Sequence, residues 1–100
     1  MTEKGVKLRH ILFNRVKSNT GFVVKIRIFE GHSEYREGNR IATIPVQLAI
    51  GQPLAYLSKD TVIKWKPPFE NEEISEDKRK EILQNTAEAM RFRGCPTEIV

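Results

Sequence analysis

Residues 61–94 decide the fold, and their sequence is TVIKWKPPFENEEISEDKRKEILQNTAEAMRFRG. Pro67 and Pro68 have no amide hydrogen and hold φ near the proline value, so a strand that carries Trp65 must end there. An acidic turn follows, and after it the spacing of apolar residues changes to that of a helix. The stretch therefore predicts a hinge, a turn and one amphipathic helix.

The predicted helix covers about residues 75–93. Ser75 is a good N-cap, because its hydroxyl accepts a hydrogen bond from the free amides of the first turn. Gly94 suits a left-handed C-cap, and Pro96 prevents the helix from continuing. Apolar residues recur at steps of three and four and form one stripe: Ile82, Leu83, Thr86, Ala87, Ala89 and Met90. We expect this stripe to pack on a sheet formed by the first two-thirds of the chain.

Residues 6–30 predict a first β-hairpin. β-branched and aromatic residues dominate its two strands, 6–17 and 22–30, and residues 18–21 between them are typical of a turn. Burying the even-numbered residues of both strands on one face requires a loop of odd length, for instance the five residues from Ser18 to Phe22. In this register His10 is a half-buried histidine that would pair with Glu30.

The next segments predict a second hairpin over 33–48 and a further strand over 54–65. Within that strand, residues 58–60 fit either a turn or a bulge, and the sequence leaves both open. Gly38-Asn39 suits the positive φ of a two-residue hairpin turn. Pro45 removes a ladder donor, which favours an edge strand or a bend that splits the element in two. Residues 97–100 could add a short terminal strand. The predicted fold is α+β: a mainly antiparallel sheet packed by one C-terminal helix, in a single domain over residues 1–100.

The composition indicates a globular protein, with 39% apolar and 30% charged residues. No apolar run approaches the roughly 20 residues that span a bilayer, and the N-terminus lacks a hydrophobic signal core. We therefore expect a cytoplasmic protein with no membrane partner. Cys95 is the only cysteine, so it forms no internal disulfide, which fits a reducing compartment. The sequence does not predict the oligomeric state.

The net charge is +4, and the excess comes from the first 29 residues, which hold seven basic residues and one acidic residue. A hairpin face that mixes cations with aromatic rings predicts one alternative function, binding of single-stranded nucleic acid. The residues of that prediction are Lys7, Arg9, Phe13, Arg15, Lys25, Arg27 and Phe29. The excess of positive charge also fits contact between the basic strand pair and an acidic partner. Over that contact we favour a solvated cationic face. Over the nucleic-acid prediction we favour a structural role, in which Ile11, Phe13 and Phe29 are covered by another element or by a second subunit.

No pattern predicts catalysis, a metal or a cofactor. His10 and His32 are 22 residues apart, and no His/Cys pair has the spacing of metal ligands. The glycines are scattered through turns, so no phosphate-binding loop is predicted. We expect a protein that is not an enzyme. An enzyme would become the better hypothesis if His10 or His32 lined a deep pocket with a carboxylate.

The acidic turn predicts an interaction surface for a basic partner. Its residues, with the two neighbouring aromatic ones, are Trp65, Phe69, Glu70, Glu72, Glu73, Glu76 and Asp77. Helix capping and solubility are the alternative role of these carboxylates. For Trp65 we favour packing against the helix stripe over a contact with a partner.

Several of these motifs together resemble one family of small immunity proteins from bacterial polymorphic toxin systems. The motifs are Lys-Trp-x-Pro-Pro at 64–68, Glu-Asn-Glu-x-Ile-Ser at 70–75 and Phe-Arg-Gly at 92–94, with the hairpin at 35–40 and Ile44-Pro45. The resemblance implies an intracellular protein that binds a cognate toxin and blocks it without catalysis. It implies no particular binding residues. A nuclease toxin would call for an acidic face, and the positive net charge argues against one unless residues 70–77 make the contact.

Overall fold

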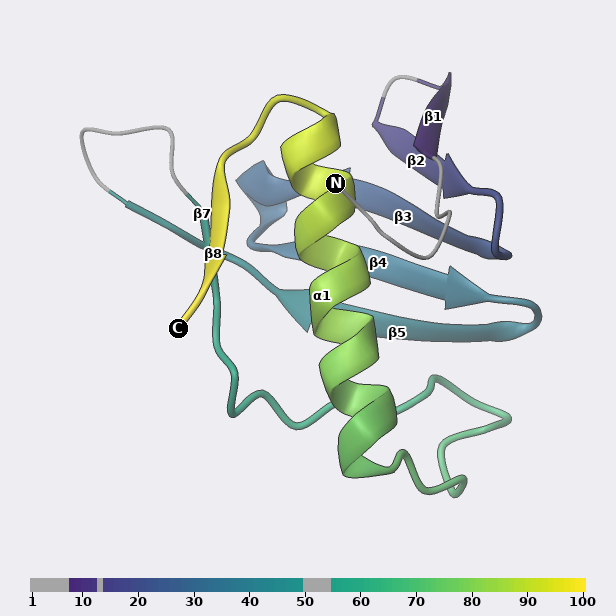
Figure 1. The fold of residues 1–100 in the computed structure, drawn as a ribbon. Coiled ribbons are helices and arrows are strands. Elements are labelled where there is room, and N and C mark those ends of the chain that lie inside the picture. Colours follow the sequence, from purple (N-terminus) through teal and green to yellow (C-terminus); the bar gives the residue numbers. More distant parts are fainter. Residues whose placement is uncertain (1–7, 13, 50–54) are drawn as a thin grey trace.

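The computed structural model describes residues 8–12, 14–49 and 55–100, in which one long helix crosses a five-stranded sheet (Figure 1). The elements in chain order are β1 (Leu8–Leu12), β2 (Arg15–Ser18), β3 (Phe22–Arg27), the 3-10 turn η1 (Ile28–Glu30), β4 (His32–Glu37), β5 (Arg40–Pro45), β6 (Gln47–Leu48), β7 (Ala55–Leu57), α1 (Glu76–Phe92) and β8 (Thr97–Ile99). The fold is α+β, as predicted.

The larger sheet is an antiparallel meander in which β1 to β5 lie side by side in chain order. Val16 lies opposite Val24 and the loop has an odd length, so the predicted register is confirmed. Ser18 and Phe22 end and begin the strands, which leaves residues 19–21 as the loop itself. The Ser18 hydroxyl accepts a hydrogen bond from the Phe22 N–H at 2.9 Å, which fixes the loop. All four residues are buried, because alternate side chains of a strand point to one face.

The second predicted hairpin is confirmed, with its turn at Gly38-Asn39. Glu37 lies opposite Arg40 across the turn, and Gly38 has a φ of 61°, a value that glycine adopts without strain. β5 ends at Pro45 and the chain continues into β6 of a second sheet, so the predicted split is also confirmed. Proline cannot donate to the ladder, which accounts for the break there.

The prediction of one strand over residues 6–17 is wrong. β1 and β2 are two antiparallel strands, and Leu12 lies opposite Arg15 across a tight turn. Asn14 lies in that turn, and its carbonyl oxygen accepts a hydrogen bond from the Ile26 N–H at 2.7 Å. Asparagine favours turns, but the β-branched residues on both sides concealed that single signal.

The smaller sheet has the order β6-β7-β8, with β7 antiparallel to β6 and parallel to β8. Of the predicted strand over 54–65, β7 (Ala55–Leu57) is confirmed, and of the two interpretations of residues 58–60 the structure has the turn. The described residues 61–65 add only an isolated bridge from Trp65 to Ala42, so the strand does not resume there. Ser58 starts the turn: its carbonyl oxygen accepts from the Thr61 N–H at 3.1 Å and its hydroxyl from the Asp60 N–H at 3.2 Å. Local bonds of this kind compete with a strand ladder. β8 confirms the predicted terminal strand.

Helix α1 has the predicted caps. The Ser75 hydroxyl accepts a hydrogen bond from the Lys78 N–H at 3.1 Å. Gly94 has a φ of 97°, which brings the Cys95 N–H to 2.9 Å from the Met90 carbonyl oxygen in a Schellman ending. The buried residues of the helix are those of the predicted stripe: Ile82, Leu83, Thr86, Ala87, Ala89 and Met90.

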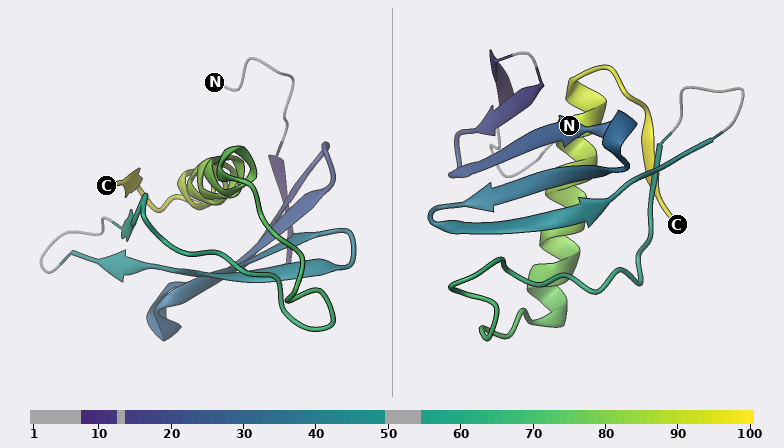
Figure 2. Two further views of the ribbon diagram at one scale, coloured as in Figure 1. Left: turned by 90° about the horizontal axis from the view of Figure 1, so that it is seen from below. Right: turned by 180° about the vertical axis from the view of Figure 1, so that it is seen from behind.

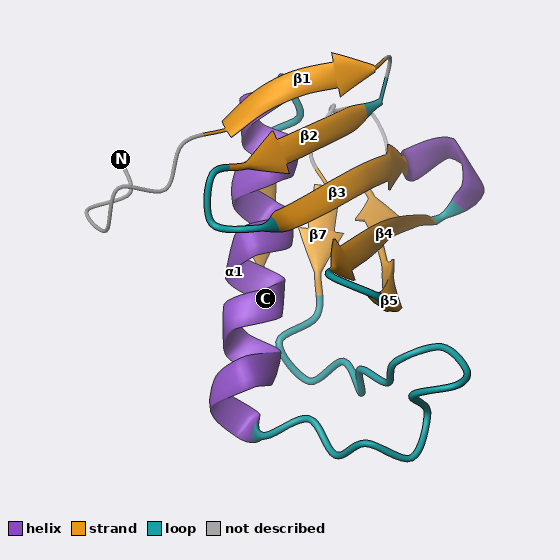
Figure 3. Ribbon diagram, turned by 90° about the vertical axis from the view of Figure 1, so that its right-hand side faces the viewer, coloured by secondary structure: helices purple, strands orange, loops and turns teal. Residues whose placement is uncertain are grey.

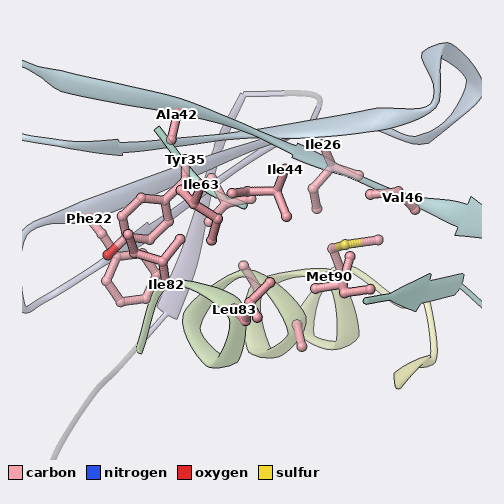
Figure 4. Packing of buried hydrophobic residues seen from close by; sticks show 14 of the residues in the cluster. Phe22, Ile26, Tyr35, Ala42, Ile44, Val46, Ile63, Ile82, Leu83 and Met90 are labelled. Atoms are coloured by element: carbon pink, nitrogen blue, oxygen red, sulfur yellow. The ribbon is translucent and has the colours of Figure 1, made fainter. Parts of the chain in front are cut away.

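The core lies between this stripe and the inward face of the larger sheet (Figure 4). Tyr35, Ile44 and Met90 are among its fully buried side chains. The rings of Phe22 and Tyr35 stack with their centroids 5.6 Å apart. Burying these apolar side chains is the main force that holds the helix on the sheet.

A polar cluster joins the helix to β4 at the edge of the core. The Tyr35 hydroxyl donates to Glu37 Oε1 at 2.7 Å and accepts from Asn85 Nδ2 at 3.2 Å, and Lys78 Nζ donates to Glu37 Oε2 at 2.7 Å. Burial raises the pKa of Glu37, but the hydrogen bonds from Lys78 and Tyr35 outweigh burial and leave that pKa below its usual value. Burial also raises the pKa of Tyr35, which keeps its hydroxyl protonated.

The molecule has two layers, and the helix covers one face of the sheet only. Figure 2 shows the sheet edge-on and from behind, and Figure 3 shows the helix standing to one side of the strands. No helix or strand of the described residues lies over the opposite face of β2 to β5. None of the described helices combines the length and the apolar character that crossing a bilayer requires.

Candidate functional site

The uncovered face of the larger sheet carries most of the excess positive charge. Its strand residues alternate with the buried ones, and Lys66 reaches this face from the following loop. We call it the cationic face and define it by Arg15, Lys17, Lys25, Arg27, Arg36 and Lys66. The strand register brings these cations together in rows: Arg15 lies opposite Lys25, while Lys17 and Arg36 flank Val23 from either side.

Two of the six cations have carboxylate partners. Lys66 Nζ lies 3.2 Å from Glu34 Oε2, and Arg27 Nη1 lies 3.1 Å from Glu30 Oε2. The others, Arg15, Lys17, Lys25 and Arg36, form no ion pair with any residue that the structure describes. Uncompensated charges of one sign on adjacent strands give the face a positive potential, which attracts an anionic partner.

Arg27 borders an open hollow near the end of α1, and the rest of the cationic face is shallow and partly apolar. Val23 and Ile41, half-buried, lie between the charged residues on this side of the sheet. A hollow of about 30 Å³ lies among Arg15, Val23, Lys25, Glu34 and Arg36. Such a hollow holds about one water molecule. The face therefore suits contact with another surface better than enclosure of a small ligand.

The second charged surface is the acidic loop, residues 70–77, and Phe69 directly precedes it. The Glu72 carboxylate accepts two hydrogen bonds from Arg40, at 2.7 and 2.6 Å, and these bonds lower the pKa of Glu72. The Arg40 guanidinium also lies 4.3 Å from the centroid of the Phe69 ring. Glu76 accepts from Arg79 Nε at 3.1 Å, which lowers the pKa of Glu76 in the same way.

Only part of the predicted acidic surface is open to a partner. Glu70, Glu73 and Asp77 are exposed and form no ion pair with a described residue. Trp65 is 6% exposed and belongs to the core, and its backbone forms an isolated antiparallel β-bridge with Ala42 of β5. This burial agrees with the interpretation that we favoured for Trp65. Phe69 is half-buried against the core.

The residues of the nucleic-acid prediction do not all come together. Lys7 and Phe13 lie outside the described residues, and Arg9 contributes described backbone to β1 but no described side chain. Arg15, Lys25 and Arg27 lie on the cationic face. Phe29 lies beyond the strand, in η1, and is 94% exposed, so the prediction that another element of this chain covers it is wrong, while coverage by a second subunit stays a prediction.

Sequence reasoning missed Arg36 and Lys66. Arg36 follows the buried Tyr35 in β4, so extending the alternation through the second hairpin would have placed Arg36 on the outer face. Lys66 comes from a loop and meets Glu34, 32 residues away, for which the sequence holds no signal.

The predicted pairing of His10 with Glu30 is also wrong. β1 pairs with β2, so His10 lies opposite Val16 in the ladder, while Glu30 pairs with Arg27. Among the described residues, no group of three His, Cys, Asp or Glu side chains is arranged to hold a metal ion. Two open hollows of about 480 and 470 Å³ lie near the end of α1, and His32 lines neither of them.

Comparison with known proteins identifies the family. The sequence model of the family described as Immunity protein 74 matches residues 25–100. The match therefore begins in β3 and includes the hairpin, the acidic loop, α1 and β8, so it extends further toward the N-terminus than the motifs that carried the resemblance. No curated protein matches the chain, and no solved structure matches it. Because the family match covers more than half of the sequence, the chain belongs to the Immunity protein 74 family.

Proposed function

We propose that this protein neutralises a cognate bacterial toxin by binding the toxin and covering a surface that the toxin needs, without catalysis of its own. The observation that carries the proposal is membership of an immunity protein family over residues 25–100. The fold is consistent with it: a sheet held by a packed helix presents a broad, rigid face, and a rigid face loses little entropy when it binds.

We further propose that the protein acts as a single domain in the cytoplasm, as part of a polymorphic toxin system. A toxin made by the same cell must be held inactive where it is made, and a cytoplasmic inhibitor meets it there. The cognate toxin should be encoded in the neighbouring reading frame, as a C-terminal domain of a larger protein.

The test is co-expression of the protein with that neighbouring toxin domain. We expect the two to co-purify in a fixed ratio and the protein to restore growth of cells that express the toxin. A core variant, Met90→Asp, serves as the negative control, because it places a charge at a fully buried position of the helix. A folded wild-type protein that neither binds the domain nor restores growth would contradict the proposal.

A further inference from the structure

We infer that the cationic face is the surface that binds the toxin, and that it docks on an acidic patch of the toxin protein. This inference rests on the proposed function and specifies the surface and the chemistry of the partner. Four cations form no ion pair with a described residue: Arg15, Lys17, Lys25 and Arg36. They are therefore available to form ion pairs with carboxylates on a partner protein. Charge complementarity of this kind steers association and selects the partner.

The composition of the face fits a protein partner. Arginine is enriched in protein interfaces, and half-buried Val23 and Ile41 offer apolar contact between the charged rows. Phe29 adds an exposed ring at the end of β3, two residues after Arg27. Aromatic residues, phenylalanine included, are enriched in protein interfaces.

The same face fits nucleic acid less well. Glu34 lies opposite Lys25 and pairs with Lys66, so its charge counts equally against a phosphate backbone and against the carboxylates of a protein. Single-stranded nucleic acid differs in that it needs aromatic side chains on which its bases stack. Phe29, beyond the end of β3, offers a single described ring for this purpose. The described outward residues of β2 to β5 include no phenylalanine, tyrosine or tryptophan: Arg15, Lys17, Val23, Lys25, Arg27, His32, Glu34, Arg36, Ile41, Thr43 and Pro45.

The acidic loop is the weaker docking surface of the two. Arg40 and Arg79 already occupy the carboxylates of Glu72 and Glu76, and a basic partner would have to displace them.

A cationic docking face also limits which site of the toxin the protein can cover. The nucleic-acid site of a nuclease is itself cationic, so this face would not cover such a site directly.

The test compares two charge reversals of equal size. Lys17→Glu/Arg36→Glu changes two exposed residues of the cationic face, and Lys59→Glu/Lys80→Glu changes two exposed residues that line a hollow beside α1. We would measure the affinity of each protein for the neighbouring toxin domain by calorimetry at low and at high salt, together with its melting temperature. A labelled single-stranded oligonucleotide serves as the second probe.

We expect the face variant to bind the toxin domain at least about tenfold more weakly than wild type at low salt. The control variant should bind as wild type does, both variants should melt as wild type does, and salt should weaken wild-type binding. Equal binding by the folded face variant would overturn the inference and leave the proposed function standing. Wild-type affinity for the oligonucleotide that exceeds its affinity for the toxin domain would overturn it in favour of nucleic acid. A wild-type protein that does not bind the toxin domain at all would overturn the proposed function, and the inference with it.

Discussion

Replacing Tyr35 by phenylalanine removes one oxygen atom from the contact between helix and sheet. The ring of Tyr35 is fully buried and stacks on Phe22, and phenylalanine can keep that packing. What the variant loses is the hydrogen bond to Glu37 at 2.7 Å and the one from Asn85 at 3.2 Å. Tyr35→Phe therefore isolates the polar link between β4 and α1 from the apolar core.

The structure sets the size of the expected effect. A hydrogen bond to a charged group contributes about 1.5–3 kcal/mol, but this contribution falls where water can replace the lost partner. The side chain of Glu37 is 37% exposed and keeps its bond to Lys78. We therefore expect the free energy of unfolding to fall by about 1–2 kcal/mol, around and below the lower limit of that range. In a chain of this size the loss lowers the melting temperature by about 4–16 °C.

The dependence on pH gives a second and sharper readout. The pKa of Glu37 is lowered in the folded protein from its usual 4.5, so Glu37 contributes stability above that value and loses it as the pH falls through the folded pKa. Tyr35 supplies one of the hydrogen bonds that lower this pKa. We expect the stability difference between wild type and Tyr35→Phe to be largest near neutral pH and to shrink in acid.

The assay is thermal and urea unfolding followed by circular dichroism, over a series of pH values. Tyr56→Phe is the matched control, because Tyr56 is half-buried in β7 and its hydroxyl bonds to no described residue. That control should change stability by less than about 0.5 kcal/mol. The reasoning is refuted if Tyr35→Phe is as stable as Tyr56→Phe, or if its deficit stays constant from neutral to acid pH.

Three further predictions concern the helix and the cationic face. Met90→Asp should abolish cooperative unfolding, since it buries an unpaired charge, whereas Gln84→Asp on the exposed side of α1 should melt as wild type. Gly94→Val should lower stability by about 1–2 kcal/mol in urea unfolding, because a φ of 97° is strained for any residue with a side chain, although a Cβ placed there would meet no atom within 4 Å beyond the neighbouring residues; unchanged stability would argue against the left-handed cap. Arg15→Glu should raise stability by a few tenths of a kcal/mol, as it faces Lys25, and should weaken toxin binding in the calorimetric assay.

The parts of the fold that the sequence predicted well are the parts whose determinants are local. Ser75 caps the helix through a bond to a residue three positions away, and Gly94 ends it through its own φ. The register of β2 and β3 followed from the alternation of side chains and the length of one loop. In each case a few neighbouring residues determine the geometry.

The parts that the sequence did not predict depend on competing or distant contacts. Residues 6–17 are rich in strand formers, so the turn at Asn14 was concealed by its neighbours. The pairs Arg40–Glu72 and Lys66–Glu34 each join residues 32 positions apart, and no local pattern anticipates them. The candidate site was predicted where alternation applies, as at Lys25, and missed where a loop supplies the cation.

The two charged surfaces differ in whether their charges are paired within the chain. Of the two, only the cationic face places like charges opposite each other on paired strands, which lowers the stability of the sheet. In the acidic loop, Glu72 and Glu76 are paired within the chain, so the charge there serves the fold. On the cationic face, Arg15 lies directly opposite Lys25, and like charges in that arrangement destabilise a sheet. Glu34 lies opposite Lys25 on its other side and offsets part of this repulsion, whereas Arg15 lies between Leu12 and Lys25 and has no acidic neighbour in the ladder. A carboxylate supplied by a partner would offset the remainder. The repulsion between Arg15 and Lys25 thus supports recognition of an acidic surface through the sheet and not through the loop.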